Sequence, residues 1–402
     1  LLIMGLVIFN AALYVFMLFF YWNKHKRLNF FLIILFIYAA TACLCAYNYS
    51  LTPYKWNDLG GGAFVYLFCI LLIFLYPLRN FEFRDNLITV ESNKKIQKLA
   101  IFYVVICFVN IAMSMDKTIE LFYSGDWAGV YDDFYANEEN VQLYESSFQK
   151  LVKNLSNYLS PFAFVYTFYL LTKPKLPKVL FFSLLLSVVI PSFMSATIVA
   201  SRGMVMFLAI KLLISYLLFS SQIPPKRKRI LLLIAAGLLA LFLFYSILVT
   251  VSRFGEDESS NSLIAYFGHS MLSFNDGIFN NLHDFAWGKR FFKWFIDLLG
   301  SDSYFSAAKA GATHGHAFYT FVGGIYIDWG PIGTIVVALI TCVFIKRFFE
   351  KHVLYLSDSI MIVFYVDFLA NGIYAYNSGR ALVWIMTYVV YLIVKKMENR
   401  YA

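Results

Sequence analysis

Residues 224–250, PPKRKRILLLIAAGLLALFLFYSILVT, combine four basic residues with a run of 21 residues that carries no charge. About twenty apolar residues in an α-helix span the hydrocarbon core of a bilayer. Lys and Arg collect in the cytoplasmic loops of membrane proteins. Residues 230–250 are therefore predicted to form a transmembrane helix that begins on the cytoplasmic side, and the same pattern recurs along the chain.

The whole chain has the composition of a membrane protein. Of its 402 residues, 60% are hydrophobic and 14% are charged, and the mean hydropathy is +0.67. A soluble domain carries roughly 25% charged residues. The 43 Phe and 29 Tyr suit interfacial aromatic belts and an apolar or sugar-binding cavity. We expect an all-α polytopic membrane protein with one integral membrane domain over 1–402 and no soluble domain.

Eleven apolar runs are long enough to cross a bilayer. They lie at residues 1–22, 28–47, 60–78, 99–115, 155–172, 178–200, 203–221, 230–250, 321–345, 356–375 and 380–395. The first run is too long for a signal-peptide core and contains no cleavage site, so it is expected to be a true span. The sequence thus predicts about eleven transmembrane helices.

The basic loops set the predicted orientation. They lie at 23–27, 79–98, 173–178, 224–229, 346–352 and in the C-terminal tail, and they alternate strictly with the other loops. This pattern puts the N-terminus outside and the C-terminus in the cytoplasm. The net charge of +9 resides in these short loops, so nucleic-acid binding is not expected. The five cysteines lie inside apolar runs without metal-ligand spacing and are expected to pack as small apolar residues.

Two external segments are predicted to be longer than simple connections. Residues 116–154 contain eight acids and three lysines, and the stretch YDDFYANEEN at 131–140 either contacts sugars or is a solvated loop. Residues 251–320 form the longest segment outside the spans. Within it, residues 286–300 have the pattern of an amphipathic interfacial helix, either a plain anchor or one whose basic side recruits a lipid-linked anion. SFNDG at 273–277 predicts a turn.

Four arginines are candidates for binding phosphate near the outer face. Arg202 opens the run 203–221, Arg253 follows 230–250, and Arg380 precedes the last span. Arg290 lies on the polar side of the amphipathic segment. One guanidinium group can donate two parallel hydrogen bonds to the oxygens of a phosphate. The ligand expected at this depth is a lipid phosphate or pyrophosphate. Each arginine alone also fits a side chain that reaches up to lipid head groups. Because separate hairpins deliver them to the side where basic residues are scarce, we favour a shared site.

The stretch ATHGHAFYTFVGGIYIDWGPIG at 312–333 carries candidates for a general base. His316 or Asp328 could accept a proton from a hydroxyl, and the glycines allow a kink or a close backbone approach. Alternatively, His314 and His316 are solvated loop residues, and Asp328 satisfies backbone groups at a helix start. HGH resembles half of a metal site, but no third ligand has suitable spacing. His269 and His283 are expected to be structural or solvated.

The order of these features resembles the bacterial oligosaccharide repeat-unit polymerases, also called O-antigen polymerases (Wzy-type), which are relatives of the O-antigen ligases. The resemblance rests on SRG at 201–203 opening a span, a long external segment, and YIDWGPIG at 326–333 starting the next span. It covers most of the chain by topology and short patches by residue.

The resemblance implies a GT-C-like, all-helical membrane glycosyltransferase that acts on the outer face of the bacterial inner membrane. The donor would be a growing glycan on undecaprenyl pyrophosphate, and the acceptor a repeat unit on the same lipid. The product would be O-antigen, capsule or exopolysaccharide. No metal, nucleotide sugar or other cofactor is expected, and the protein partner would be a regulator of chain length.

The candidate residues divide into three predicted roles. The pyrophosphate would be held by Arg202, Arg253, Arg380 and Arg290, the base would be His316 or Asp328, and His314, Tyr319 and Tyr326 would contact the glycan. The ligase relatives carry a histidine before a span-opening glycine motif, which His316 matches loosely, so the base stays open between two residues. One base suffices for a single displacement, which predicts inversion at the anomeric carbon.

Three other functions fit parts of the pattern. An O-antigen ligase would perform the same chemistry with lipid A–core as acceptor. A transporter or flippase of lipid-linked glycans would spread polar and basic residues through its spans, whereas here charge concentrates at the outer face. A membrane acyltransferase would use a histidine near the cytoplasmic side, but His25 and His352 lie in basic loops without suitable partners. The polymerase is favoured over each.

Overall fold

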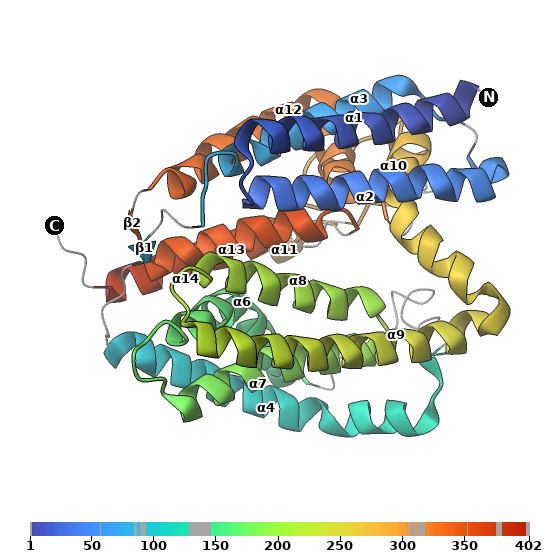
Figure 1. Cartoon of the computed structure of the whole chain (residues 1–402). Helices are drawn as coiled ribbons and strands as arrows, with labels where there is room; N and C mark the ends of the chain where they lie inside the picture. Colours follow the sequence, from blue (N-terminus) through green and yellow to red (C-terminus); the bar gives the residue numbers. More distant parts are fainter. Residues whose placement is uncertain are drawn as a thin grey trace. The chain divides into compact units, whose positions relative to one another are not determined.

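The protein is described from a computed structural model that covers residues 2–56, 58–83, 87–88, 94–127, 129, 146–302, 304–305, 310–311, 318–351, 353–374 and 380–398, with the backbone alone for residues 2, 87–88 and 253–266. Helices dominate these residues (Figure 1). The strands β1, Leu87–Ile88, and β2, Val353–Leu354, form one short parallel pair.

Each predicted apolar run overlaps a helix. The helices are α1 Leu2–His25, α2 Phe30–Leu51, α3 Gly61–Leu75, α4 Lys94–Ser124, α6 Ser147–Leu170, α7 Lys178–Ile198, α8 Arg202–Phe219, α9 Pro225–Gly268, α12 Thr320–Phe349, α13 Leu356–Asn371 and α14 Ala381–Met397. Shorter elements connect them: η1 Pro53–Lys55, η2 Tyr76–Leu78, α10 Ser270–Ser273, η3 Phe274–Phe279 and α11 Lys293–Leu298. The apolar runs therefore located the long helices correctly.

Eight helices of the described chain are long and apolar enough to cross a membrane. They are α1, α2, α3 extended by η2, α4, α7, α8, the Pro225–Ser252 part of α9, and α12. This confirms an all-α, multi-pass membrane protein. Helices α13 and α14 have 16 and 17 residues, and α6 is long but less apolar. The count of eleven spans, the GT-C-like architecture, the kind of membrane and the orientation stay predictions.

The chain divides into two compact units. Unit 1 comprises residues 1–85, 260–352 and 365–386, and unit 2 comprises 86–259, 353–364 and 387–402. Both units are assembled from segments far apart in the sequence. One integral domain over 1–402 stays a prediction.

In unit 1, α1 packs against α2 and α3, and α3 packs along α12 (Figure 1). Two buried tyrosines tie the second half of α13 to this group. The Tyr38 hydroxyl of α2 donates to the Leu369 carbonyl at 3.1 Å, and the Tyr365 hydroxyl donates to the Phe74 carbonyl of α3 at 2.6 Å. A buried hydroxyl is stabilising only when it has such a partner, so these bonds fix how α13 meets α2 and α3.

In unit 2, α4 packs along α6 and α7, and α8 packs against α6 and α7 (Figure 1). Helix α9 joins them through Tyr245, whose hydroxyl donates to the Ala196 carbonyl at 2.9 Å. Only 6% of the most apolar window of Pro225–Ser252 is buried within the protein. Such an exposed apolar surface is stable in lipid and not in water, which supports a lipid-facing α9.

Helices extend into both ends of the predicted external segments, so the stretches between the helices are shorter than expected. Helix α4 continues to Ser124 and α6 begins at Ser147, and α9 continues to Gly268, so helices occupy the margins of 116–154 and 251–320. The predicted helix over 286–300 is wrong in extent, because only α11, Lys293–Leu298, is helical. Trp287 and Gly288 have φ of 50° and 81°, which a right-handed helix excludes.

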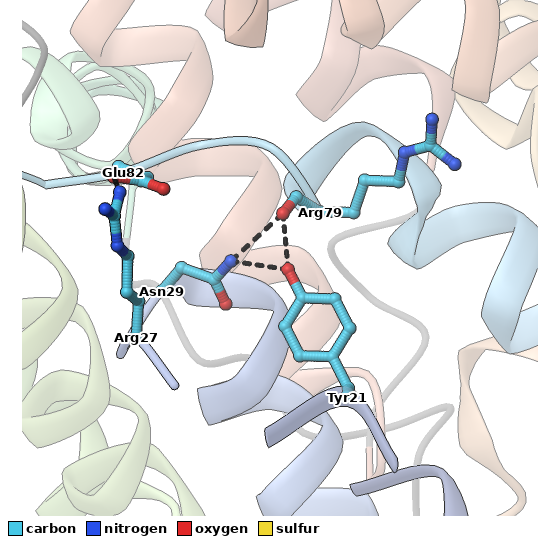
Figure 2. Close-up of polar contacts among 5 residues, drawn as sticks. All are labelled: Tyr21, Arg27, Asn29, Arg79 and Glu82. Carbon is cyan, nitrogen blue, oxygen red and sulfur yellow. Dashed lines mark hydrogen bonds and ion pairs between the residues drawn. The ribbon is translucent and has the colours of Figure 1, made fainter. Parts of the chain in front are cut away.

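A polar junction holds the α1–α2 hairpin against the chain that follows η2 (Figure 2). The Asn29 amide donates to the Tyr21 hydroxyl at 2.7 Å and to the Arg79 carbonyl at 3.1 Å, and the Tyr21 hydroxyl donates to the same carbonyl. Asn29 Oδ1 also caps α2 by accepting from Leu32 N at 3.0 Å. Nearby, Arg27 and Glu82 form an ion pair at 2.5 Å with side chains 66% and 30% exposed.

Asn29→Ala is expected to lower the stability of the protein by about 1–3 kcal/mol, because it removes a buried helix cap and leaves the partly buried Arg79 carbonyl with one donor fewer. Arg27→Ala is the matched control at the same junction, and it is expected to change stability by less than about 1 kcal/mol because the pair is exposed. Thermal unfolding of the purified protein in detergent measures both. Equal shifts for the two variants would contradict this account of the junction.

Candidate functional site

Helix α12 is broken where the sequence reads Trp329-Gly330-Pro331. Gly330 has φ 66° and ψ −173°, a conformation that only glycine adopts easily. Pro331 has no N–H and cannot donate to the carbonyl of Ile327, four residues earlier. The break therefore frees carbonyl groups on α12 just before it.

The chain at 286–290 uses these freed carbonyls. Ala286 N donates to the Ile327 carbonyl at 2.8 Å, and Gly288 N donates to the Asp328 carbonyl at 3.3 Å. The left-handed turn at 287–288 brings the backbone close to α12, and a Cβ on Gly288 would lie 2.7 Å from the Trp329 ring. Gly288, which lies outside the predicted glycine-rich stretch 312–333, thus serves contact between two segments of unit 1.

The Asp328 side chain continues the same contact. It is fully buried, and its Oδ1 accepts a hydrogen bond from Arg290 N at 3.1 Å. The Arg290 guanidinium donates to the Tyr319 hydroxyl at 2.5 Å and lies 5.6 Å from the centre of the Tyr319 ring. Asp328, Arg290 and Tyr319, predicted as candidates from the sequence, are therefore brought together, with Asp328 holding the backbone from which Arg290 projects.

A second arginine is attached to the same place. Ala381 N, at the start of α14, donates to the Phe291 carbonyl at 3.0 Å. Arg380 precedes Ala381 and Arg290 precedes Phe291, so this bond sets the two arginines on adjacent backbones. Arg380 and Lys289 are exposed, and Arg290 is half-buried. Adjacent cations at a protein surface favour a ligand with several negative charges.

Aromatic and apolar side chains surround this cationic site. Trp329 lies 6.4 Å from Phe291 and 6.3 Å from Phe292 between ring centres. Beyond them, large apolar side chains are exposed: Trp287 by 73%, Trp294 by 47%, Leu298 by 67% and Leu299 by 80%. Tryptophan and apolar residues beside lysines are typical of the membrane–water interface. A cationic site among them is suited to the head group of a lipid.

Tyr326 is buried, whereas its predicted role as a glycan contact would require an exposed ring. It is 6% exposed, and its ring lies within 6.0 Å of the rings of Tyr66, Phe274, Phe279 and Phe285. Its faces are therefore occupied by aromatic neighbours. The structure assigns Tyr326 to packing behind Asp328 in this conformation, while Tyr319 remains at the surface end of the site.

The predicted turn at 273–277 is wrong, because these residues belong to α10 and the π-helix η3 and are buried. Asn275 exchanges two hydrogen bonds with Gly60: Gly60 N donates to Oδ1 at 2.9 Å, and Nδ2 donates to the Gly60 carbonyl at 2.8 Å. Asp276 Oδ1 accepts from Asp58 N at 2.7 Å. These side chains fix the loop before α3, and π-helices often occur at functional sites.

His269 is structural rather than solvated. Its Nδ1 lies 2.6 Å from the Ser273 hydroxyl, and its ring centre lies 4.9 Å from that of Trp56. The sequence had left His269 open between a structural and a solvated role, and it had not singled out Asn275 and Asp276 beyond a predicted turn. A usable signal was the polar pair Asn275-Asp276 within the mainly apolar stretch 271–279.

Arg202 lies in unit 2 and is 8% exposed. Its guanidinium donates to Thr250 Oγ1 of α9 at 2.6 Å. Next to it, the turn between α7 and α8 is covered by an apolar cluster of Trp127, Ala196, Ala200, Val205, Tyr245 and Val249. The segment predicted to be an acidic external loop therefore contributes Trp127 to the surroundings of Arg202.

The remaining candidates are not placed. His314 and His316 lie outside the described residues, and the side chain of Arg253 is not described, although its backbone belongs to α9. Within the described residues no group of three or more His, Cys, Asp or Glu side chains is arranged to hold a metal ion.

Gly330→Ala is expected to lower the stability by about 1–3 kcal/mol, because alanine is strained at φ 66° and its Cβ would lie 3.1 Å from the Phe285 ring. Gly237→Ala is the matched control, since nothing lies within 4 Å of that position in α9, and it is expected to be neutral or stabilising by up to ~1 kcal/mol. Thermal unfolding in detergent compares them. A Gly330→Ala protein as stable as the parent would refute the proposed strain.

Comparison of the chain with protein-family models, with curated proteins and with solved structures finds no significant match.

Proposed function

We propose that the protein is a membrane glycosyltransferase that polymerises undecaprenyl-pyrophosphate-linked oligosaccharide repeat units on the outer face of a bacterial inner membrane. The hydrogen bond from Ala381 N to the Phe291 carbonyl carries the proposal, because it places the backbones of Arg380 and Arg290 next to each other. The exposed Trp287 and Trp294 beside them suit a site at head-group depth. A lipid pyrophosphate has the charge and the location that this surface favours.

The proposed reaction is one displacement at the anomeric carbon of the donor. The acceptor hydroxyl attacks this carbon, and the bond from the carbon to the pyrophosphate oxygen breaks. The electron pair leaves with undecaprenyl pyrophosphate, whose growing charge Arg290 and Arg380 stabilise. The hydroxyl proton passes to a base, and a new glycosidic bond forms with inversion.

Within this proposal Asp328 positions Arg290. Its carboxylate is fully buried and accepts from the backbone N–H of Arg290, so it does not face a sugar hydroxyl in this conformation. A general base must lie within hydrogen-bond reach of the proton that it removes. We therefore assign the base to His316 on the strength of the sequence, with Tyr319 and His314 as glycan contacts.

Arg202 and Arg253 remain proposed pyrophosphate ligands from the sequence alone, since both belong to unit 2. The bond from Arg202 to Thr250 orients the guanidinium before a ligand binds. Membrane lipids and a chain-length regulator are the further partners proposed.

The direct test uses the purified full chain in detergent with a synthetic undecaprenyl-pyrophosphate repeat unit, in the presence of a chelator. A ladder of lengthening glycans with released undecaprenyl pyrophosphate is expected. An intact substrate would contradict the polymerase, and products formed only with lipid A–core as acceptor would instead identify a ligase. Transfer of the substrate across liposomes without chemistry would identify a flippase.

Arg290→Ala and Arg380→Ala are each expected to reduce the rate of polymerisation by roughly 10²-fold, as the loss of one donor to a developing anion does in other enzymes. The matched control is Arg229→Ala, an exposed arginine at the start of α9, which is expected to retain full activity. Product ladders are quantified at equal amounts of folded protein. Full activity of both site variants would show that Arg290 and Arg380 do not bind the pyrophosphate.

Asp328→Asn and Asp328→Ala separate positioning from proton transfer. Asparagine keeps an oxygen that can accept from Arg290 N, so Asp328→Asn is expected to retain most of the activity, whereas Asp328→Ala is expected to lose it. His316→Ala is expected to be inactive with unchanged thermal stability. Equal inactivity of the Asn and Ala variants at 328, with an active His316→Ala protein, would instead make Asp328 the base.

A further inference from the structure

An open groove of about 420 Å³ lies in unit 2 between the beginnings of α4 and α7. Its walls are mainly apolar and include Ile101 and Val104 of α4 and Val179 and Leu180 of α7. Val179 is 83% exposed and Ile101 is 47% exposed. Both helices are candidate membrane spans that begin here, so the groove lies where a bilayer changes from head groups to acyl chains.

Lysines form the rim of the groove. Lys178 lines it directly from the first residue of α7. On α4, Gln97, Ile101 and Val104 are spaced by four and three residues and share one face of the helix. Lys94 and Lys98 precede Gln97 and Ile101 by three residues each, so they flank this face within the first turns of α4. All three lysines are exposed.

We propose that this groove binds one anionic phospholipid. Its acyl chain lies against the apolar walls, and its phosphate lies among Lys94, Lys98 and Lys178. Each Lys near an anionic head group contributes roughly 1 kcal/mol of attraction, and no acidic side chain lines the groove among the described residues. A free phosphate would leave the apolar walls uncovered, and a zwitterionic lipid would not use the positive rim.

The proposal is independent of the glycosyltransferase hypothesis. Every residue of the groove belongs to unit 2, and none belongs to the site around Arg290. Binding of the lipid would join the first turns of α4 and α7. It is therefore expected to raise the thermal stability of the protein as well as to give a measurable complex.

Native mass spectrometry of the full chain tests the proposal with phosphatidylglycerol and phosphatidylcholine of matched acyl chains. We expect the parent protein to retain one phosphatidylglycerol in preference to phosphatidylcholine. The double variant Lys98→Gln/Lys178→Gln is expected to weaken phosphatidylglycerol binding roughly thirtyfold, as the loss of two lysines near a head group predicts. Phosphatidylcholine binding should not change.

The double variant Lys24→Gln/Lys26→Gln is the matched control, since it removes two exposed lysines at the end of α1. It is expected to bind phosphatidylglycerol like the parent. Ile101→Trp fills the groove and keeps the lysines, and it is expected to reduce binding of phosphatidylglycerol. In a separate competition experiment, inorganic phosphate is expected not to displace the lipid from the parent protein. Unchanged selectivity of Lys98→Gln/Lys178→Gln, or an equal loss in the control, would overturn the proposal.

Discussion

The arrangement of unit 1 depends on how the backbone carbonyls at the break of α12 are satisfied. Ile327 and Asp328 are buried within the protein, and a buried carbonyl without a donor costs several kcal/mol because water cannot reach it. Pro331 removes the helical donor for Ile327, and Ala286 N takes its place at 2.8 Å. The Tyr66 hydroxyl donates to the Pro331 carbonyl at 2.6 Å. The chain at 286–290 therefore pairs the carbonyl that the break frees, and the bond from Tyr66 attaches α3 at the same place on α12.

This coupling explains why charged groups gather at one point of an apolar unit. The segment held by the break carries Lys289 and Arg290, and the carbonyl that follows them, Phe291 O, binds the start of α14. Asp328 lies on α12 where its carboxylate completes the attachment. Breaking this bond would leave a buried carboxylate with one donor fewer, which is costly. The position of Arg290 is thus set by the backbone, and its guanidinium is left to interact with Tyr319.

The sequence predicted the long helices because their apolar runs are intrinsic to each segment. It left the glycines of 312–333 open between a kink and a close backbone approach, and a kink occurs at Gly330. It did not predict the helix limits at 286–300, because the left-handed turn there is stabilised by carbonyls of α12, about 40 residues away along the chain. It also mistook 273–277 for a turn. Asn and Asp favour turns by bonding to nearby backbone, whereas Asn275 and Asp276 bond to residues 58–60.

Burial distinguishes the arginines that topology alone had grouped together. Arg202 is 8% exposed and bonded to Thr250, so part of the cost of removing its charge from water is offset before any ligand binds. Arg380 is exposed and remains hydrated. A phosphate that replaces water at Arg380 exchanges one set of hydrogen bonds for another. The net binding free energy then comes from the negative charge of the phosphate and from the neighbouring Arg290. The two arginines of unit 1 therefore suit a ligand that exchanges with water, whereas Arg202 is held in place by Thr250 before any ligand binds.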